Sequence, residues 1–307
     1  MSATGVRRIL VSGATGKQGG SVVRALLARP PPFEIEILAL TRKATSASAQ
    51  KLAQNPEVKI ISGDLDNVPA IFEATGGKDS IWGVFSVQVP SMKKLQEGVV
   101  DREVKQGCDL FDESLKMGVK HFVYSAVDRG GEPKSWDTPT KVAHFITKRD
   151  VELHMRNHTQ AVSNMTYTII RPVAFFENLA PNFIGRAFAA MWAQMGQRRL
   201  QFCSTVDVGR FAALAFADPE SEDFKNKAFA IAGDEITQEE GNAKFSRVLG
   251  RPMVQTYWFL ASFIQWMVSD LGIMFRWFKD DGYGADVAWC KKMNPEMLDF
   301  ETWLKME

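Results

Sequence analysis

The sequence is poor in the residues that build disulfide frameworks and metal centres. Its 307 residues include three cysteines and four histidines. Cys108, Cys203 and Cys290 are odd in number, far apart and form no CxxC motif, so we expect no disulfide framework and a reduced, cytoplasmic setting. Because no His, Cys and carboxylate residues cluster at ligand spacing in the sequence, we expect no metal site.

An excess of charge of either sign is also missing. The formal net charge is +1, which argues against direct nucleic-acid binding and against attachment to an anionic membrane surface. Residues 1–8 are short and polar, so we expect no secretory leader. A hydrophobic content of 45% and a charged content of 24% are typical of a soluble globular protein.

A glycine-rich turn between an apolar strand and a helix is the strongest positive signal. Residues 8–11 predict the strand and residues 21–28 continue as a helix, with Gly13, Gly16 and Gly19 between them. Glycines at this spacing turn the chain, let the backbone approach a pyrophosphate and pack the helix on the strand. The pattern therefore predicts a dinucleotide site, and an ordinary glycine-rich turn is the alternative.

Strands and helices alternate through the first part of the chain. Strands are expected at residues 34–40, 58–61, 81–87, 119–125 and 165–172, and helices at 47–54, 68–74, 95–117 and from about 140. This alternation predicts an α/β fold with a doubly wound, parallel Rossmann sheet. We expect a dinucleotide domain at residues 1–172 and a smaller, mostly helical lobe at 173–307. Residues 206–232, a helix and a strand, are expected to return to the first domain; further helices are expected at 237–249 and 295–306.

The end of the second strand bears on the choice of cofactor. A carboxylate usually stands here in sites that prefer NAD, where it binds the ribose 2′-hydroxyl. Here the strand ends in Thr41-Arg42-Lys43. Because arginine grips a phosphate by a forked, charge-assisted contact, Arg42 and Lys43 favour NADP(H). The alternative is a solvated turn.

Polar residues follow the other strands as well. Asp64, after the third strand, is placed to hydrogen-bond an adenine amine or to cap the next helix. Asp66 or Asn67 is the better expected cap, which leaves Asp64 free. Gln88 follows the fourth strand, where the nicotinamide half would lie.

Three further candidates follow the fifth strand. Ser125 stands at its carboxyl end, as a site residue or as the cap of a turn. His144 and Lys148 are four residues apart in the next helix and so share one face of it. Two solvated surface side chains are the alternative for this pair.

Residues 257–278 are rich in aromatics and invite a membrane interpretation. Gln265, Asp270 and Arg276 interrupt the segment, and its apolar spacing is amphipathic, which argues against a spanning helix. We expect these aromatics to pack in the core of the C-terminal lobe, with a partner or lipid surface as the alternative.

Several of these motifs together resemble the NmrA-like family, an atypical branch of the short-chain dehydrogenase/reductase superfamily. The resemblance covers most of the chain. It rests on residues 13–20, 41–42, 63–64, 122–125, 144–152, 167–172, 176–179, 274–278 and 300–304.

The resemblance implies a Rossmann domain that binds NADP(H). It places residues 15–18 at the phosphates, Arg42 and Lys43 at the adenosine end, and Lys148 at the nicotinamide ribose. It also permits a nuclear location beside the cytoplasmic one. The cofactor residues expected from the motifs and the resemblance together are Gly13, Thr15, Gly16, Lys17, Gln18, Gly19, Arg42, Lys43, Asp64, Leu65, Val87, Gln88, Lys148, Val173, Phe175, Phe176 and Asn178.

The chain departs from the parent superfamily at the catalytic tyrosine. Catalytic short-chain reductases carry a Tyr four residues before the Lys, and here His144 stands in that place. None of the four tyrosines begins a YxxxK motif. The departure favours a redox-sensing regulator with little dehydrogenase activity, which would act through a protein partner and bind oxidised and reduced cofactor unequally.

The alternative function is an NADPH-dependent reductase of a small hydrophobic carbonyl, imine or enone compound. His144 would donate the proton, Ser125 would hydrogen-bond the substrate oxygen, and Lys148 would complete the catalytic group. The aromatic-rich lobe would supply an apolar pocket. A monomer and a homodimer both remain open.

Overall fold

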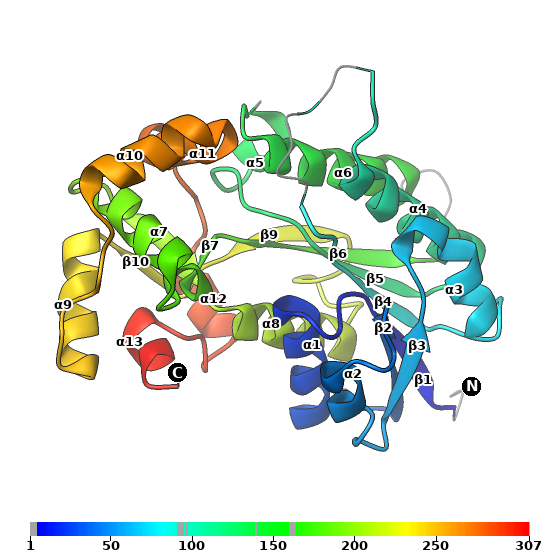
Figure 1. The fold of residues 1–307 in the computed structure, drawn as a ribbon. Coiled ribbons are helices and arrows are strands. Elements are labelled where there is room, and N and C mark those ends of the chain that lie inside the picture. The colour runs from blue at the N-terminus through cyan, green and yellow to red at the C-terminus, as the bar shows by residue number, and fades with distance from the viewer. Residues whose placement is uncertain (1–4, 91–94, 96–97, 139, 160–163, 307) are drawn as a thin grey trace.

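A seven-stranded parallel sheet forms the centre of the molecule (Figure 1). The computed structural model describes residues 5–90, 95, 98–138, 140–159 and 164–306. The strand order is β3-β2-β1-β4-β5-β6-β9, so the predicted doubly wound α/β fold is confirmed. The strands are β1 (Arg7–Val11), β2 (Ile35–Thr41), β3 (Val58–Ser62), β4 (Gly83–Ser86), β5 (His121–Ser125), β6 (Thr166–Pro172) and β9 (Lys227–Ile231).

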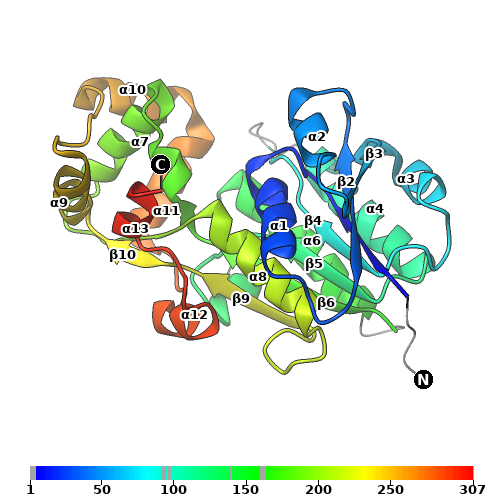
Figure 2. The same cartoon turned by 90° about the horizontal axis from the view of Figure 1, so that it is seen from below.

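Helices cover both faces of this sheet, as parallel strands require. One face packs against α1 and α8, which lie side by side in Figure 2. The other face packs against α3, α4 and α6. The helices of this part are α1 (Lys17–Ala28), α2 (Ala47–Leu52), α3 (Val68–Ala74), α4 (Arg102–Lys116), α5 (Lys134–Asp137), α6 (Ala143–Thr159) and α8 (Thr205–Ala217), with a 3₁₀ turn η1 (Leu65–Asn67).

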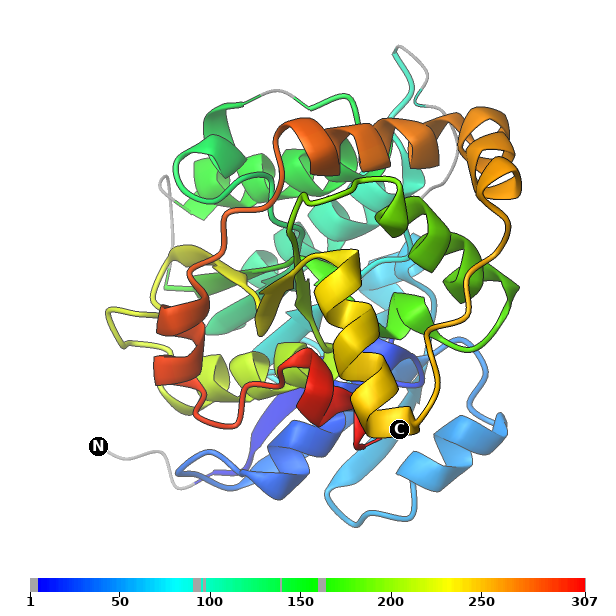
Figure 3. The ribbon, with the colours of Figure 1, turned by 90° about the vertical axis from the view of Figure 1, so that its left-hand side faces the viewer.

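A smaller lobe stands beyond the carboxyl ends of the strands (Figure 3). Its three-stranded sheet has the order β10-β8-β7, and its aromatic core joins α7, α9, α11 and α13. The elements are β7 (Ala174–Phe175), η2 (Phe176–Leu179), α7 (Phe183–Ala193), β8 (Leu200–Cys203), β10 (Asp234–Ile236), α9 (Gln238–Leu249), α10 (Trp258–Met267), α11 (Ser269–Asp280), α12 (Val287–Met293) and α13 (Phe300–Leu304).

Two helices begin later than predicted because an aspartate caps each of them. Asp101 accepts a 2.8 Å hydrogen bond from the Glu103 amide at the start of α4, whereas the prediction began at residue 95. Of the predicted extension, residues 96–97 lie outside the described residues. Asp299 likewise accepts a 2.8 Å bond from the Thr302 amide at the start of α13, so the prediction of a helix from residue 295 is wrong at its start.

The aromatic segment, residues 257–278, meets solvent differently in its two helices. In α11, Phe275 is buried in the lobe core. Along α10, all of which is described, Ala261 is the one buried residue, and Trp258 and Trp266 are 74% and 78% exposed. The prediction of core packing is therefore wrong for α10, because its aromatics occupy the face turned away from the lobe.

The two helices of this segment can also be compared with the length that a membrane-spanning helix needs. Among the described residues, no single helix is long and apolar enough to cross a membrane. The α10–α11 pair passes only when both helices are taken together, and it bends by 113° at the break.

Candidate functional site

The carboxyl ends of β1 and β4 define the crevice of the sheet. The two strands are neighbours, and the chain continues from them toward opposite edges, β2 and β3 on one side, β5 and β6 on the other. Ligands of open α/β sheets bind at such a switch point. The loops that follow these strands therefore hold the candidate site.

The glycine loop after β1 packs so closely on the start of α1 that a side chain at Gly19 would not fit. A Cβ at Gly19 would lie 2.4 Å from the Gly13 carbonyl oxygen and 2.5 Å from that of Ser12. Gly13 itself has φ +60°, a conformation that glycine adopts without strain. The N-cap of α1, Gly16, offers no side-chain hydrogen bond, so the first amides of the helix are open to an anion. This loop fits a pyrophosphate.

Ser12 ties this loop to the end of β4. Its hydroxyl accepts a 2.8 Å hydrogen bond from the Val87 amide and donates one of 3.1 Å to the Val87 carbonyl. Both sides of the crevice are thereby held together. Ser12 escaped the sequence prediction because a serine after a strand gives no sign of a partner 75 residues away.

Gln18, Ser125 and Lys148 come together as a connected group. The Ser125 hydroxyl donates a 2.6 Å hydrogen bond to Gln18 Oε1. The Lys148 ammonium donates a 3.3 Å bond to the Ser125 carbonyl. The sequence placed Ser125 and Lys148 in consecutive elements and Gln18 in the glycine loop, and the fold brings the three to one place at the ends of β1 and β5.

Glu103 is the buried counter-ion of Lys148 and was missed in the sequence. Glu103 Oε1 lies 3.0 Å from Lys148 Nζ, and both side chains are more than nine-tenths buried. Thr147 donates a 2.6 Å bond to the other carboxylate oxygen. Since an ammonium has three donors and the hydrogen bond to Ser125 uses one of them, Lys148 keeps a donor for a ligand hydroxyl.

His144 is held by a carboxylate from the lobe. Its Nδ1 donates a 2.9 Å hydrogen bond to Asp270 Oδ2, and the ring is 16% exposed. Asp270 Oδ1 accepts a 2.8 Å bond from the Ala143 amide at the start of α6. Burial raises the pKa of Asp270, but the hydrogen bonds from His144 and Ala143 outweigh it and hold that pKa below its ordinary value.

No described tyrosine replaces the missing proton donor. Tyr124 lies close to the lysine, with its ring centroid 5.7 Å from Lys148 Nζ. It is fully buried on the sheet face that packs against α4 and α6. Burial first, and then the charges of Glu103 and Glu152, raise the pKa of Tyr124 well above its ordinary value, so this phenol keeps its proton.

Gln88 follows β4, and one atom of its side-chain amide lacks a hydrogen-bond partner among the described residues. Its side chain is 4% exposed, and its Nε2 donates a 2.8 Å bond to the Ser86 hydroxyl. Oε1 is buried without a hydrogen-bond partner among the described residues. An unpaired buried acceptor is costly unless a ligand donor meets it. Gln88 therefore fits the border of a bound carboxamide.

The residues after β2 and β3 differ in how free they are. Arg42 and Lys43 are exposed, and in the described part of the chain neither makes an ion pair. The prediction that Asp64 is free is wrong. Asp64 accepts a 3.1 Å hydrogen bond from the Asp66 amide and caps η1, which begins at Leu65. Of the two predicted caps, Asn67 is the N-cap residue of α3 but makes no side-chain cap hydrogen bond, and Asp66 binds Arg102. The extra turn η1 moves the cap position back to Asp64.

The segment after β6 divides between the crevice and the lobe. Val173 is buried, Phe175 is half-buried and Asn178 is exposed. Phe176 is fully buried and stacks on Phe202 at a centroid distance of 5.6 Å. Its side chain thus belongs to the lobe core, which leaves only its backbone to border a cofactor.

Comparisons with known proteins extend this geometry. The NmrA-like family domain-containing oxidoreductase hkm9 of Aspergillus hancockii is 33% identical over 191 residues, which cover 60% of this chain and 52% of that protein. This chain thus spans about half the length of that relative.

Two solved structures share the fold. Citrobacter sp. triphenylmethane reductase complexed with NADP(H) has a TM-score of 0.71 at 16% identity, covering 98% of this chain and 99% of that one. NmrA, a negative transcriptional regulator, has a TM-score of 0.71 at 17% identity, covering 98% and 95%. Finally, the sequence model of the NmrA-like family matches residues 6–304. The chain therefore belongs to the NmrA-like family.

Proposed function

We propose that the protein is an NADP(H)-binding reductase of small hydrophobic carbonyl, imine or enone compounds. The observation that carries this proposal is the 2.9 Å hydrogen bond between His144 and Asp270. A histidine oriented by a carboxylate is a recurrent proton-transfer arrangement. The sequence alone favoured a regulator because no tyrosine begins a YxxxK motif.

The cofactor would lie along the carboxyl edge of the sheet. The open amides of α1 and the glycine loop would bind its pyrophosphate, and Arg42 with Lys43 would bind the 2′-phosphate. Lys148 would donate a hydrogen bond to the nicotinamide ribose, and Gln88 Oε1 would accept from the carboxamide. When bound, NADPH supplies the hydride.

The protein's own groups would handle the proton. With Nδ1–H engaged by Asp270, a protonated His144 has Nε2–H as its free donor for a substrate oxygen or nitrogen. The Ser125 hydroxyl donates to Gln18 and retains lone pairs that can orient a substrate donor or water. Lys148, neutralised by Glu103, would position the cofactor rather than donate the proton.

The family's named relatives support a reductase. One is called an oxidoreductase and another a triphenylmethane reductase complexed with NADP(H). The second candidate function, a redox-sensing regulator, is favoured by the His144 replacement of tyrosine and by the name of NmrA, a negative transcriptional regulator. A regulator must bind NADP⁺ and NADPH to different effect.

Consumption of NADPH with a panel of aldehydes, ketones, quinones, imines and enones tests the proposal. We expect turnover with at least one apolar compound and a loss of about 100-fold in kcat in His144→Gln, at the lower end of what general acid catalysis contributes. NADPH affinity should not change in this variant. The exposed His158→Gln is the matched control.

Two results would separate the functions. No turnover across the panel, together with partner binding that differs between the NADP⁺ and NADPH forms, would favour the regulator. Calorimetric titration of Arg42→Ala with NADP(H) and NAD(H) tests the cofactor separately. We expect this variant to lose about tenfold in affinity for NADP(H) and little for NAD(H), since only NADP(H) carries the 2′-phosphate.

A further inference from the structure

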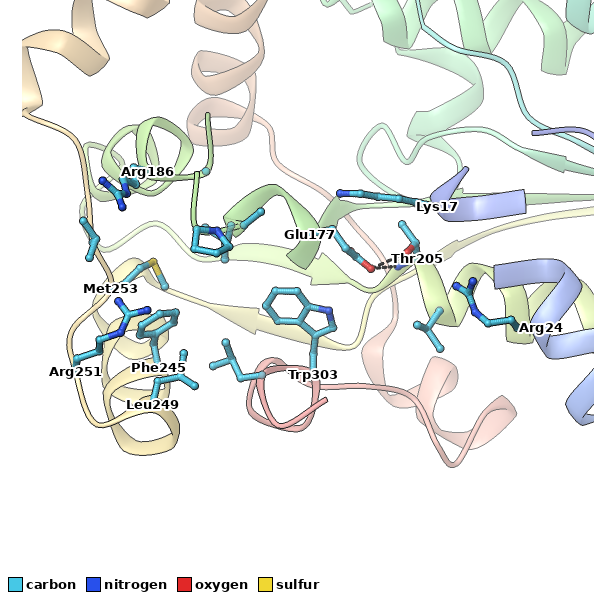
Figure 4. A pocket seen from close by; sticks show the side chains of 17 residues that line it. Lys17, Arg24, Glu177, Arg186, Thr205, Phe245, Leu249, Arg251, Met253 and Trp303 are labelled. Carbon is cyan, nitrogen blue, oxygen red and sulfur yellow. Dashed lines mark hydrogen bonds between the residues drawn. The ribbon is translucent and has the colours of Figure 1, made fainter. Parts of the chain in front are cut away.

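A second cavity lies between the glycine loop and the lobe (Figure 4). Its volume is about 490 Å³, and its walls come from α1, α8, η2, α7, α9 and α13. Among the described residues that line it, none is Ser125, His144 or Lys148. The cavity is therefore not lined by the proposed proton donor.

Its lining combines an apolar floor with positive charge. Phe245, Met253 and Trp303 contribute the floor and are each at least nine-tenths buried. Four cationic side chains and a single carboxylate line the same space. The cations are Lys17, Arg24, Arg186 and Arg251.

The single carboxylate is fixed in place at the end of the cavity where Lys17 lies. Glu177 Oε1 accepts hydrogen bonds of 2.9 Å from Ser204 and of 2.8 Å and 2.7 Å from Thr205. Figure 4 shows Lys17 extending toward Glu177. This end of the cavity therefore holds the one carboxylate among the described lining residues, although no ion pair joins it to Lys17.

The opposite end has no carboxylate among the described lining residues. Arg186 and Arg251 lie beyond the apolar floor, on the far side from Lys17 (Figure 4). In the described part of the chain, neither makes an ion pair, and the Arg251 guanidinium lies 5.5 Å from the centroid of the Phe245 ring. Two free guanidiniums beside an aromatic floor match a ligand with a negative head and an apolar body.

We propose that this cavity binds an amphipathic anion, a carboxylate or phosphate monoester joined to an aliphatic or aromatic body, beside a bound dinucleotide. The anionic head lies between Arg186 and Arg251. The body follows Phe245 and Met253 toward Trp303. This site goes beyond the proposed reduction, because Ser125, His144 and Lys148 do not line it; among the described lining residues, Lys17 alone belongs to the predicted cofactor site.

Calorimetric titration with decanoate, decyl phosphate and 1-decanol, each below its micellar concentration, tests the proposal. The protein is titrated with and without saturating NADP(H). We expect both anions to bind the dinucleotide-saturated protein at least tenfold more tightly than the alcohol. The difference between the two anions tells whether a carboxylate or a phosphate is the preferred head.

Variants locate the binding. Arg186→Gln/Arg251→Gln should weaken the binding of both anions at least tenfold and leave 1-decanol unaffected. Arg247→Gln is the matched control, since Arg247 also lies on the lobe, pairs with Glu301 and does not line the cavity.

Three outcomes would overturn the proposal: no anion binding, equal binding of the alcohol, or unchanged binding in the double variant. Displacement of the anions by NADP(H) would also overturn it, because the cations would then serve the dinucleotide. Dinucleotide affinity is measured on the same samples, so a failure of the proposed cofactor site is seen separately.

Discussion

His144 and Asp270 are 126 residues apart in the chain, and Asp270 Oδ2 accepts a 2.9 Å hydrogen bond from His144 Nδ1. The bond links α6, on the central sheet, to the first turn of α11 in the lobe. The same carboxylate caps α6 through the Ala143 amide. One side chain therefore both orients the histidine and joins the lobe to α6.

Asp270→Asn should separate these two roles. An asparagine still offers an oxygen to the Ala143 amide, and Asn serves as well as Asp at an N-cap, so we expect stability to fall by about 1 kcal/mol or less. If the protein is a reductase, kcat should fall about 10- to 100-fold, because the imidazolium loses its countercharge.

Steady-state kinetics against pH and thermal denaturation measure the two effects of Asp270→Asn. The double variant with His144→Gln should be no slower than His144→Gln alone, since residues that act as a unit are not additive. An unchanged kcat and pH profile in Asp270→Asn would mean that the carboxylate is only a cap.

The glycine loop predicts a different contrast. A Cβ at Gly19 would meet backbone oxygens at 2.4 and 2.5 Å, whereas at Gly20 the nearest atom is 3.2 Å away. Backbone cannot move aside as a side chain does. Gly19→Ala should cost about 1–3 kcal/mol, as overpacking does, and weaken dinucleotide binding, while Gly20→Ala, whose Cβ would lie 3.2 Å from the Ala14 carbonyl oxygen, should cost less. Denaturant unfolding and calorimetry check this, and equal behaviour of the two variants would contradict it.

The features that were predictable from the sequence are those written in local patterns. The glycine spacing, the apolar strands and the residues at their carboxyl ends depend on neighbours within a few positions. Asp270 and Glu103 were missed because their partners are far away in the sequence. His144 is 126 residues from Asp270, and Lys148 is 45 residues from Glu103.

The aromatic helix α10 illustrates a second limit. Hydrophobicity predicts burial, yet Trp258 and Trp266 are largely exposed while Phe275 in the next helix is buried. Which of two adjacent apolar helices contacts the lobe depends on the 113° bend between them, and no local pattern encodes that bend. Asp270 lies just after the bend, where it reaches α6.

His121 predicts how stability varies with acid. Its ring is fully buried between Thr166, at 2.8 Å, and Thr168, at 3.2 Å. Burial lowers the pKa of His121 from 6.5 to about 3. Because the unfolded chain binds the proton more readily, the stability that this neutral ring contributes is present above pH 6.5 and is lost as the pH falls toward 3.

Between pH 6.5 and 5 this loss should amount to about 2 kcal/mol at 1.4 kcal/mol per unit. Asp207 acts in the opposite sense, since burial raises its pKa from 3.8 to about 6. The stability that this group contributes therefore falls as the pH rises from 3.8 to about 6. The difference between wild type and His121→Gln in urea titrations isolates the histidine. The exposed His158→Gln should keep the wild-type slope, and so would His121→Gln if the prediction is wrong.

Glu152 is the shared partner of two buried arginines. Its carboxylate lies 2.6 Å from Arg129 Nη2 and 2.8 Å from Arg171 Nη2, and all three side chains are at most 1% exposed. Burial lowers the pKa of Arg171, but the Glu152 charge outweighs it and raises that pKa above its ordinary value. The Arg171 guanidinium therefore remains charged in the core.

Glu152→Gln should destabilise the protein by about 3–5 kcal/mol, because it removes the countercharge and leaves two buried cations. Glu132→Gln is the matched control: Glu132 also pairs with Arg171 but is 46% exposed, so its loss should cost less than about 1 kcal/mol. Unfolding in urea measures both. If the two variants lost equal stability, charge compensation by Glu152 would not be what holds β5, β6 and α6 together. A triple variant that replaces Glu152, Arg129 and Arg171 by apolar residues tests this further. Compensation predicts that the triple variant recovers most of the stability lost in Glu152→Gln, and a triple variant as unstable as Glu152→Gln would contradict it.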